Sequence, residues 1–111
     1  MYPDVIQLIP IGKTFEGREM KVVYLSTDHR KTKPAIWVDA GIHAREWIAP
    51  SVVLQAIHRL VTDPNAVDML RGVDWYFLPV FNPDGYEYSH KVVSIAFPLD
   101  GVSERHELVP I

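Results

Sequence analysis

Three neighbouring residues, His43, Arg45 and Glu46, have side chains that suit metal-assisted chemistry. Histidine supplies an imidazole nitrogen and glutamate a carboxylate oxygen, and zinc binds both kinds of atom in tetrahedral sites. The arginine between them carries a fixed positive charge on a planar group with several donors. We therefore interpret residues 41–47 as half of a metal site.

Spacing alone leaves two interpretations of this motif open. A catalytic zinc site needs three protein ligands and an open position for water, whereas His43 and Glu46 are only two. A His-x-x-Glu pair also arises readily by chance, and a solvated loop is the simple alternative. The surroundings favour a site, because the pair follows Gly41, which permits close approach, and lies where a strand-like run meets a helix-like pattern.

The residues on either side of the motif predict a strand followed by a helix. Residues 35–40 are almost continuously apolar, as expected for a central strand that is covered on both faces. Pro50 is compatible with the first turn of a helix, which places Glu46 near a helix N-terminus. An amphipathic helix that packs on a sheet is indicated by apolar residues at helical spacing, namely Val53, Ile57, Leu60 and Val61.

A second strand completes a crossover unit. Asp63 and Pro64 predict the start of a short helix that reaches Leu70 before Gly72 stops it, and residues 75–81 predict the strand, with Pro79 indicating an irregular end. The two strands of such a unit are parallel, and the connection between them is right-handed. Ligands of open α/β sheets gather at the carboxyl ends of strands, so we expect the loop of His43 to neighbour a turn at residues 82–85.

The segment before this unit predicts an antiparallel hairpin. Pro10 cannot donate to a ladder, which places the strand of residues 5–11 at an edge or gives it a bulge, and we expect an edge strand. Residues 20–25 form its partner beyond a turn at residues 15–18. The expected fold class is α/β, with a partial mixed β-sheet made of the hairpin and a right-handed β-α-β unit, and helices packed on it. Residues 91–111 are expected to be a weakly ordered tail.

Composition and charge exclude several classes of protein. The chain has 111 residues, enough for one domain, and its 48% hydrophobic content is typical of a packed globular protein. A net charge of −3 without a basic stripe argues against a nucleic-acid partner. The absence of cysteine excludes disulfides and thiolate metal sites. No apolar run approaches the roughly 20 residues that span a bilayer, and the first residues do not form a signal peptide, so we expect no membrane partner.

Three separated blocks, residues 11–18, 34–48 and 82–90, resemble the zinc metallocarboxypeptidases of the A/B type. They occur in the order in which that family has them. The resemblance covers most of this chain but only part of the family's catalytic domain. We therefore expect residues 1–90 to be a partial metallocarboxypeptidase catalytic domain and residues 91–111 to be a divergent tail.

The resemblance implies a role for each residue of the motif. His43 and Glu46 match the first two zinc ligands of the family, and Arg45 matches a residue that contacts the substrate near the scissile bond. In that family one zinc ion polarises the scissile carbonyl and activates water, and a separate glutamate is the general base. The reaction removes C-terminal amino acids from peptides or proteins, and the family is secreted.

The resemblance also implies groups that have no counterpart in this sequence: the third zinc ligand, the catalytic glutamate and the residues that clamp the substrate's terminal carboxylate. His90 and His106 are the local candidates for a third ligand, although His90 matches a family position that is not a ligand. Glu87, Glu104 and Glu107 are the candidates for a base. We expect a truncated form that carries two zinc ligands, binds zinc weakly and is inactive alone.

A non-enzymatic function is the alternative. A sheet that lacks the neighbours of a whole domain leaves apolar surface and an unpaired strand edge exposed. The chain would then be a fragment that binds peptides or proteins, or associates with itself, through the exposed sheet.

Overall fold

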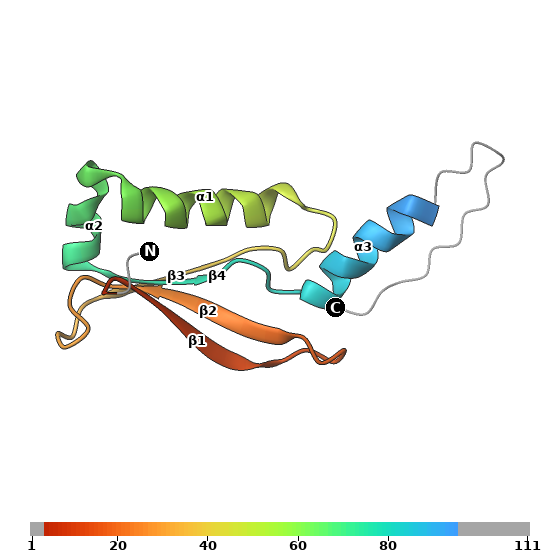
Figure 1. Cartoon of the computed structure of the whole chain (residues 1–111), viewed down its shortest axis with the longest axis horizontal. Coiled ribbons are helices and arrows are strands. Elements are labelled where there is room, and N and C mark those ends of the chain that lie inside the picture. The colour runs from red at the N-terminus through yellow and green to blue at the C-terminus, as the bar shows by residue number, and fades with distance from the viewer. Residues whose placement is uncertain (1–3, 96–111) are drawn as a thin grey trace.

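The computed structural model describes residues 4–95, which form a mixed four-stranded sheet with helices along one face and at one end (Figure 1). Its elements in chain order are β1 (Ile6–Lys13), β2 (Glu19–Leu25), β3 (Ala35–Asp39), α1 (Ile48–Thr62), the 3-10 helix η1 (Pro64–Ala66), α2 (Val67–Gly72), β4 (Asp74–Leu78) and α3 (Pro83–Ile95). Within this range no helix has the length and apolar character needed to cross a membrane.

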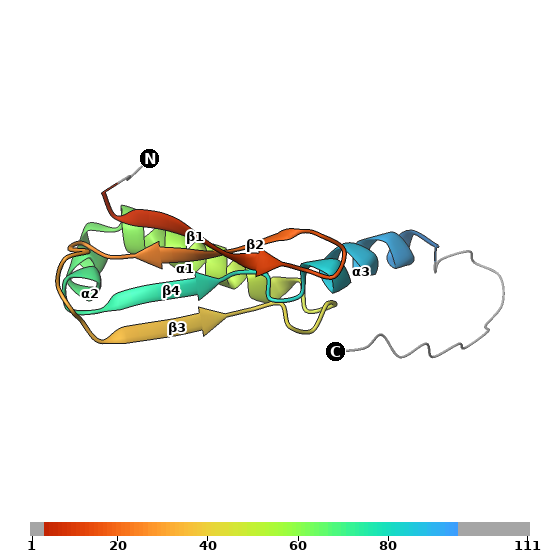
Figure 2. The same ribbon diagram turned by 90° about the horizontal axis from the view of Figure 1, so that it is seen from below.

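The sheet has the strand order β1-β2-β4-β3 and contains both kinds of pairing. Strands β1 and β2 form an antiparallel hairpin, and β2 also pairs antiparallel with β4. Strands β3 and β4 are parallel, and α1 makes the right-handed connection between them (Figure 2). The predicted hairpin and β-α-β unit are therefore confirmed, and β4 joins the two.

The first strand lies at one edge of the sheet, as its proline predicts. The register between β1 and β2 shifts between Pro10 and Gly12, which marks a bulge. A proline is tolerated here because its missing N–H leaves no gap in a ladder on the open side of an edge strand.

Strand β3 lies at the other edge, so the prediction of a central strand covered on both faces is wrong for the described part of the chain. It pairs with β4 alone, and four of its five residues are exposed. Trp37 is 52% exposed, and no described helix covers the face of the sheet opposite α1 (Figure 1). An apolar run predicts a strand, but it does not determine which strands pair with it. The position of β3 in the sheet depends on the topology of the whole sheet.

The core lies between α1 and the sheet. Val53 and Leu60 of α1 are buried in one cluster with Leu25 of β2 and Phe77 of β4. Full burial of an aliphatic or aromatic side chain stabilises a fold by about 1.5–3 kcal/mol, so these residues hold the helix against the strands. The other predicted members of the apolar face, Ile57 and Val61, are partly buried against the same cluster.

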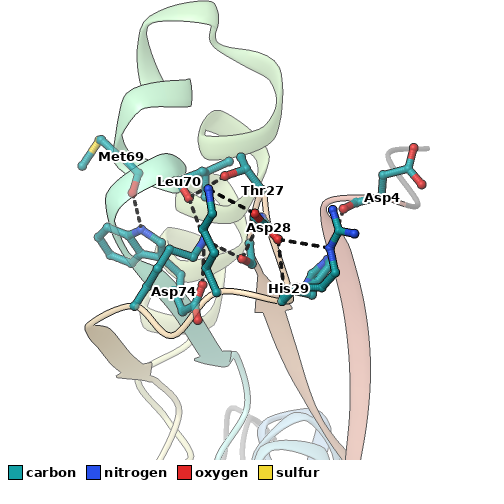
Figure 3. A network of polar contacts seen from close by, with 12 residues as sticks. Asp4, Thr27, Asp28, His29, Met69, Leu70 and Asp74 are labelled. Atoms are coloured by element: carbon teal, nitrogen blue, oxygen red, sulfur yellow. Dashed lines mark hydrogen bonds and ion pairs between the residues drawn. The ribbon is translucent and has the colours of Figure 1, made fainter.

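A buried polar network closes the end of the sheet opposite α3 (Figure 3). The Lys33 ammonium lies 2.9 Å from Oδ1 of Asp74, and both side chains are almost completely buried, with 7% and 10% exposed. The same ammonium donates to the Ser26 hydroxyl at 2.6 Å and to the Leu70 carbonyl at 3.3 Å. Thr27 donates to this carbonyl at 3.0 Å. The network ties the loop before β3 to the end of α2 and the start of β4.

Helix α3 begins where the sequence predicts a turn, so the prediction of a turn at residues 82–85 is wrong. The Asn82 side-chain oxygen accepts a hydrogen bond from the Gly85 N–H at 2.9 Å, which caps the helix. Pro83 occupies the first helical position, where it has no N–H to leave unpaired. Residues 91–95 form the last turn of α3, and residues 96–111 of the predicted tail lie outside the described range.

Candidate metal site

The loop that carries the motif follows β3, and it contains a glycine, Gly41, whose backbone conformation and close neighbours disfavour any side chain. Gly41 has φ +70°, a conformation that L side chains rarely adopt. A Cβ at this position would lie 3.2 Å from Cγ of Pro50 and 3.5 Å from Cα of Val80. The chain can therefore turn tightly between the end of β4 and the first turn of α1.

His43 and Glu46 lie together on this loop. The Glu46 N–H donates to the His43 carbonyl at 3.2 Å, which closes a turn and places both side chains on the same side. Nδ1 of His43 is then 3.0 Å from Oε1 of Glu46, and the two side chains are 74% and 58% exposed. The predicted pair is thus formed, next to the N-terminus of α1 and open to solvent.

The separation of these two atoms suits a shared zinc ion. A nitrogen and an oxygen on one tetrahedral zinc, each about 2.0–2.2 Å from the metal, lie about 3.4 Å apart. The observed 3.0 Å differs from this separation by only a few tenths of an ångström, and both side chains are exposed. The pair fits zinc as two of its ligands.

A third ligand does not lie within residues 4–95, where no three histidine, cysteine, aspartate or glutamate side chains form a metal-binding group. His90 stacks on the Trp47 ring at 4.2 Å, and its Nδ1 contacts the Tyr86 carbonyl at 2.9 Å. Glu87 is paired with Lys91 at 3.1 Å. The remaining candidates, His106, Glu104 and Glu107, lie outside the described range.

Arg45 is exposed on the same loop, between the two ligands in sequence. A guanidinium there adds positive charge and donors beside His43 and Glu46. Such a group can bind a carbonyl or carboxylate of a ligand that reaches the metal from solvent. His58 is exposed on α1, and His29 is exposed on the loop before β3.

The loop of the motif and the segment after β4 are neighbours, as the topology predicts. The Phe81 N–H donates to the Ala40 carbonyl at 2.7 Å, and the Asn82 N–H donates to the Gly41 carbonyl at 3.0 Å. These bonds continue the parallel pairing of β3 and β4 past the ends of both strands.

Two residues that hold the loop were not singled out by sequence reasoning. The Trp47 indole N–H donates to Oγ of Ser89 at 2.9 Å, and Ser89 lies 3.2 Å from the Ala44 carbonyl and 2.7 Å from the Tyr86 carbonyl. Ser89 is buried, so its hydroxyl connects α3 to the motif from inside the protein. A serine on the inner face of an amphipathic helix is the only signal that the sequence gives.

A third group joins α3 to the hairpin. Asp84, in the first turn of α3, accepts hydrogen bonds from Thr14 at 2.8 Å, from Arg18 at 2.7 Å and from the Glu16 N–H at 3.1 Å. Partial burial raises the pKa of the Asp84 carboxyl, but these three donors outweigh it and leave the pKa below its ordinary value. Hydrogen bonds to Glu16 and Asp84 raise the pKa of the Arg18 guanidinium.

Solved structures with the same fold define the class to which this arrangement belongs. Carboxypeptidase A from Helicoverpa armigera matches with a TM-score of 0.76 and 38% identity, over 80% of this chain and 22% of that protein. Bovine thrombin-activatable fibrinolysis inhibitor, solved in complex with a tick carboxypeptidase inhibitor, matches with a TM-score of 0.72 and 38% identity, over 81% and 28%. The fold is that of part of a carboxypeptidase domain.

Sequence comparisons give the same result. The model of the zinc carboxypeptidase family matches residues 1–105, and the chain belongs to this family. It is 49% identical over 90 residues to carboxypeptidase B of Helicoverpa zea and 45% identical over 92 residues to carboxypeptidase A4 of Mus musculus. The matches cover 79% of this chain but only 21% and 22% of these relatives, so it spans about a fifth of their length.

Proposed function

We propose that this chain forms the part of a zinc carboxypeptidase catalytic domain that supplies two zinc ligands, His43 and Glu46, and a substrate-binding arginine, Arg45. The observation that carries the proposal is the 3.0 Å approach of Nδ1 of His43 to Oε1 of Glu46 beside an exposed arginine. A bound zinc ion would polarise a scissile carbonyl and activate water. The proposed substrates are the C-termini of peptides or proteins, and the family relation supports an extracellular location.

We also propose that this chain alone does not hydrolyse peptides. Two ligands bind zinc weakly and leave the ion more open than the three-ligand catalytic sites of this kind. Within residues 4–95, the pair is not part of a group of three or more histidine, cysteine, aspartate or glutamate side chains that could hold a metal ion. Hydrolysis therefore depends on groups other than those that residues 4–95 offer.

Zinc binding tests the half-site directly. Titration calorimetry of the full chain should detect weak binding of one zinc ion, and His43→Ala should weaken it at least about tenfold, equivalent to about 1.4 kcal/mol. His58→Ala is the matched control, because His58 is also exposed but lies away from the motif on α1. Equal losses in both variants, or no effect of His43→Ala, would show that zinc binds elsewhere.

An activity assay tests the second part of the proposal. Incubation of peptides with the purified chain and zinc should release no C-terminal amino acids above the buffer control. Release that stops on addition of a chelator and is lost in His43→Ala would contradict it, and would point to a third ligand among residues 96–111 or in the substrate.

A binding function is the second candidate, and the exposed edge of β3 favours it. This edge presents backbone donors and acceptors together with the apolar side chains of Ile36 and Trp37, both exposed. A peptide or a second copy of the chain could add a strand there. Sedimentation velocity over a hundredfold concentration range should show association that is independent of zinc. A monodisperse monomer with a cooperative melt would rule out self-association through this edge.

A further inference from the structure

The first two turns of α3 bridge two loops that are far apart in sequence. On one side, Asp84 holds the hairpin loop through Thr14, 70 residues away, and through the Glu16 N–H and Arg18. We call Asp84, Thr14, Glu16 and Arg18 the α3 clasp. Thr14 also accepts a hydrogen bond from the Arg18 N–H at 3.0 Å, so the loop side of the clasp is fixed internally.

On the other side, the same two turns touch the loop of the motif. A Cβ at Gly85 would lie 3.0 Å from Cβ of Ala44, which shows how closely the helix approaches that loop. Ser89 lies one turn further on and contacts both Trp47 and the Ala44 carbonyl. Glu46 lies between Ala44 and Trp47 in sequence, and His43 directly precedes Ala44.

The position of α3 makes its orientation depend on the α3 clasp. The helix extends past the end of the sheet, and its later turns have no strand beneath them (Figures 1 and 2). Its orientation therefore depends on contacts made by its beginning, where the Asn82 N–H binds the Gly41 carbonyl and Asp84 binds the hairpin loop. Release of either contact allows the start of the helix to tilt away from the motif.

We propose that Asp84 is a positioning residue for the metal-binding loop, which it holds in place by clamping the start of α3 between this loop and the hairpin loop. The carboxylate is suited to this role because each of its two oxygens accepts hydrogen bonds from a different part of the hairpin loop. Oδ1 accepts from Thr14 and Arg18, and Oδ2 accepts from the Glu16 N–H. An asparagine keeps the size of this side chain but has one acceptor oxygen and no charge.

The proposal rests on the proposed function only in the statement that the positioned loop binds zinc. The positioning itself is a property of the apoprotein. Positioning by Asp84 predicts that a substitution in the hairpin loop alters the mobility of residues 41–47. No hydrogen bond or ion pair of the described residues joins these two loops directly.

Hydrogen exchange measured by mass spectrometry on the full chain tests this prediction. Asp84→Asn should accelerate exchange of amides at residues 41–47 and at Asn82 by about tenfold, and leave amides of β2 and β4 unchanged. Thr14→Val removes a donor from the other side of the clasp and should act on the same amides. The double variant should exceed the stronger single variant only slightly, because both changes open one clasp.

Asp28→Asn is the matched control, since Asp28 accepts hydrogen bonds within its own loop at the opposite end of the sheet. It should leave residues 41–47 unchanged. Uniform acceleration across all strands in Asp84→Asn would mean a general loss of stability and would overturn the proposal. Unchanged exchange at residues 41–47, or full additivity of Thr14→Val and Asp84→Asn, would overturn it as well.

A zinc titration of Asp84→Asn separates this proposal from the function of the site. Several-fold weaker binding than in the unaltered chain, with normal binding in Asp28→Asn, would support both. If the unaltered chain binds no zinc, the proposed function fails, and the exchange data still decide whether Asp84 positions the loop. Unaltered zinc affinity in Asp84→Asn together with faster exchange at residues 41–47 would overturn the link to metal binding.

Discussion

Replacement of Lys33 by methionine should be among the most costly single substitutions in the described part of the chain. The change keeps most of the aliphatic stem but removes the ammonium from a site where Lys33 and Asp74 are 7% and 10% exposed. Breaking a buried ion pair from one side typically costs about 3–5 kcal/mol, because the remaining charge stays buried without a partner. The Ser26 hydroxyl and the Leu70 carbonyl also lose a donor.

The expected magnitude lies at the lower end of this range, about 3 kcal/mol. Although the ammonium is 2.9 Å from Oδ1 of Asp74, this oxygen has no hydrogen bond of good geometry, so the contact with Lys33 is an ion pair and not an aligned hydrogen bond. The Ser26 and Tyr24 hydroxyls, which also lower the pKa of the Asp74 carboxyl, remain in the variant. For a domain of this size, each kcal/mol lowers Tm by about 4–8 °C.

The pH dependence provides a sharper test. Burial raises the pKa of Asp74, but the Lys33 ammonium and the Ser26 and Tyr24 hydroxyls outweigh it and leave the pKa below its ordinary value. A carboxyl with a lowered pKa stabilises the fold above its unfolded pKa of about 3.9, and this contribution is lost as the pH falls through the folded pKa. In Lys33→Met burial is no longer balanced, so the pKa of Asp74 rises and the carboxyl becomes neutral more readily.

Urea unfolding of both proteins at pH 7 and pH 4 measures the effect. The difference in the free energy of unfolding should be largest at pH 7 and should shrink at pH 4, where protonation removes the buried charge from the variant. Lys21→Met is the control, because the exposed pair of Lys21 and Glu19 should contribute less than about 1 kcal/mol. A cost below 1 kcal/mol for Lys33→Met, or a difference that does not change with pH, would refute the reasoning.

Two further substitutions test the loop of the motif by thermal or urea unfolding. Gly41→Ala should destabilise the protein by about 1–2 kcal/mol because of its positive φ and close neighbours, whereas Gly72→Ala, with open space and no positive φ, should change stability little. Trp47→Phe should cost about 1 kcal/mol through the lost bond to buried Ser89, and Trp37→Phe, which loses an exposed bond, should cost less. Equal effects within either pair would contradict these explanations.

The sequence predicts the elements well where local chemistry decides them. The proline at position 10 identifies an edge strand and its bulge, and apolar spacing identifies the buried face of α1. The pairing of His43 with Glu46 also follows from their spacing at the end of a strand. In each case the deciding residues lie within a few positions of one another.

Features that depend on distant partners could not be predicted in this way. The apolar run of β3 resembles a buried central strand, but its place in the sheet is set by which strands pair with β4. An Asn-Pro-Asp-Gly sequence is compatible with a turn and with a capped helix, and the continuation of the chain to Ile95 decides between them. The contact of Thr14 with Asp84 requires the complete topology, since nothing near either residue in the sequence indicates the other.

The central place of β4 has a consequence for how the chain folds. The hairpin of β1 and β2 closes through a short loop, whereas β4 pairs with β2 across about half of the chain and with β3 across a helical connection. Closing the long segments that separate β4 from its partners costs conformational entropy before stabilising contacts form. We therefore expect the pairing of β4 to limit the folding rate. Phe77→Leu in β4 should then slow refolding, while Ile9→Val in β1 should mainly speed unfolding, a contrast that stopped-flow measurements can establish or exclude.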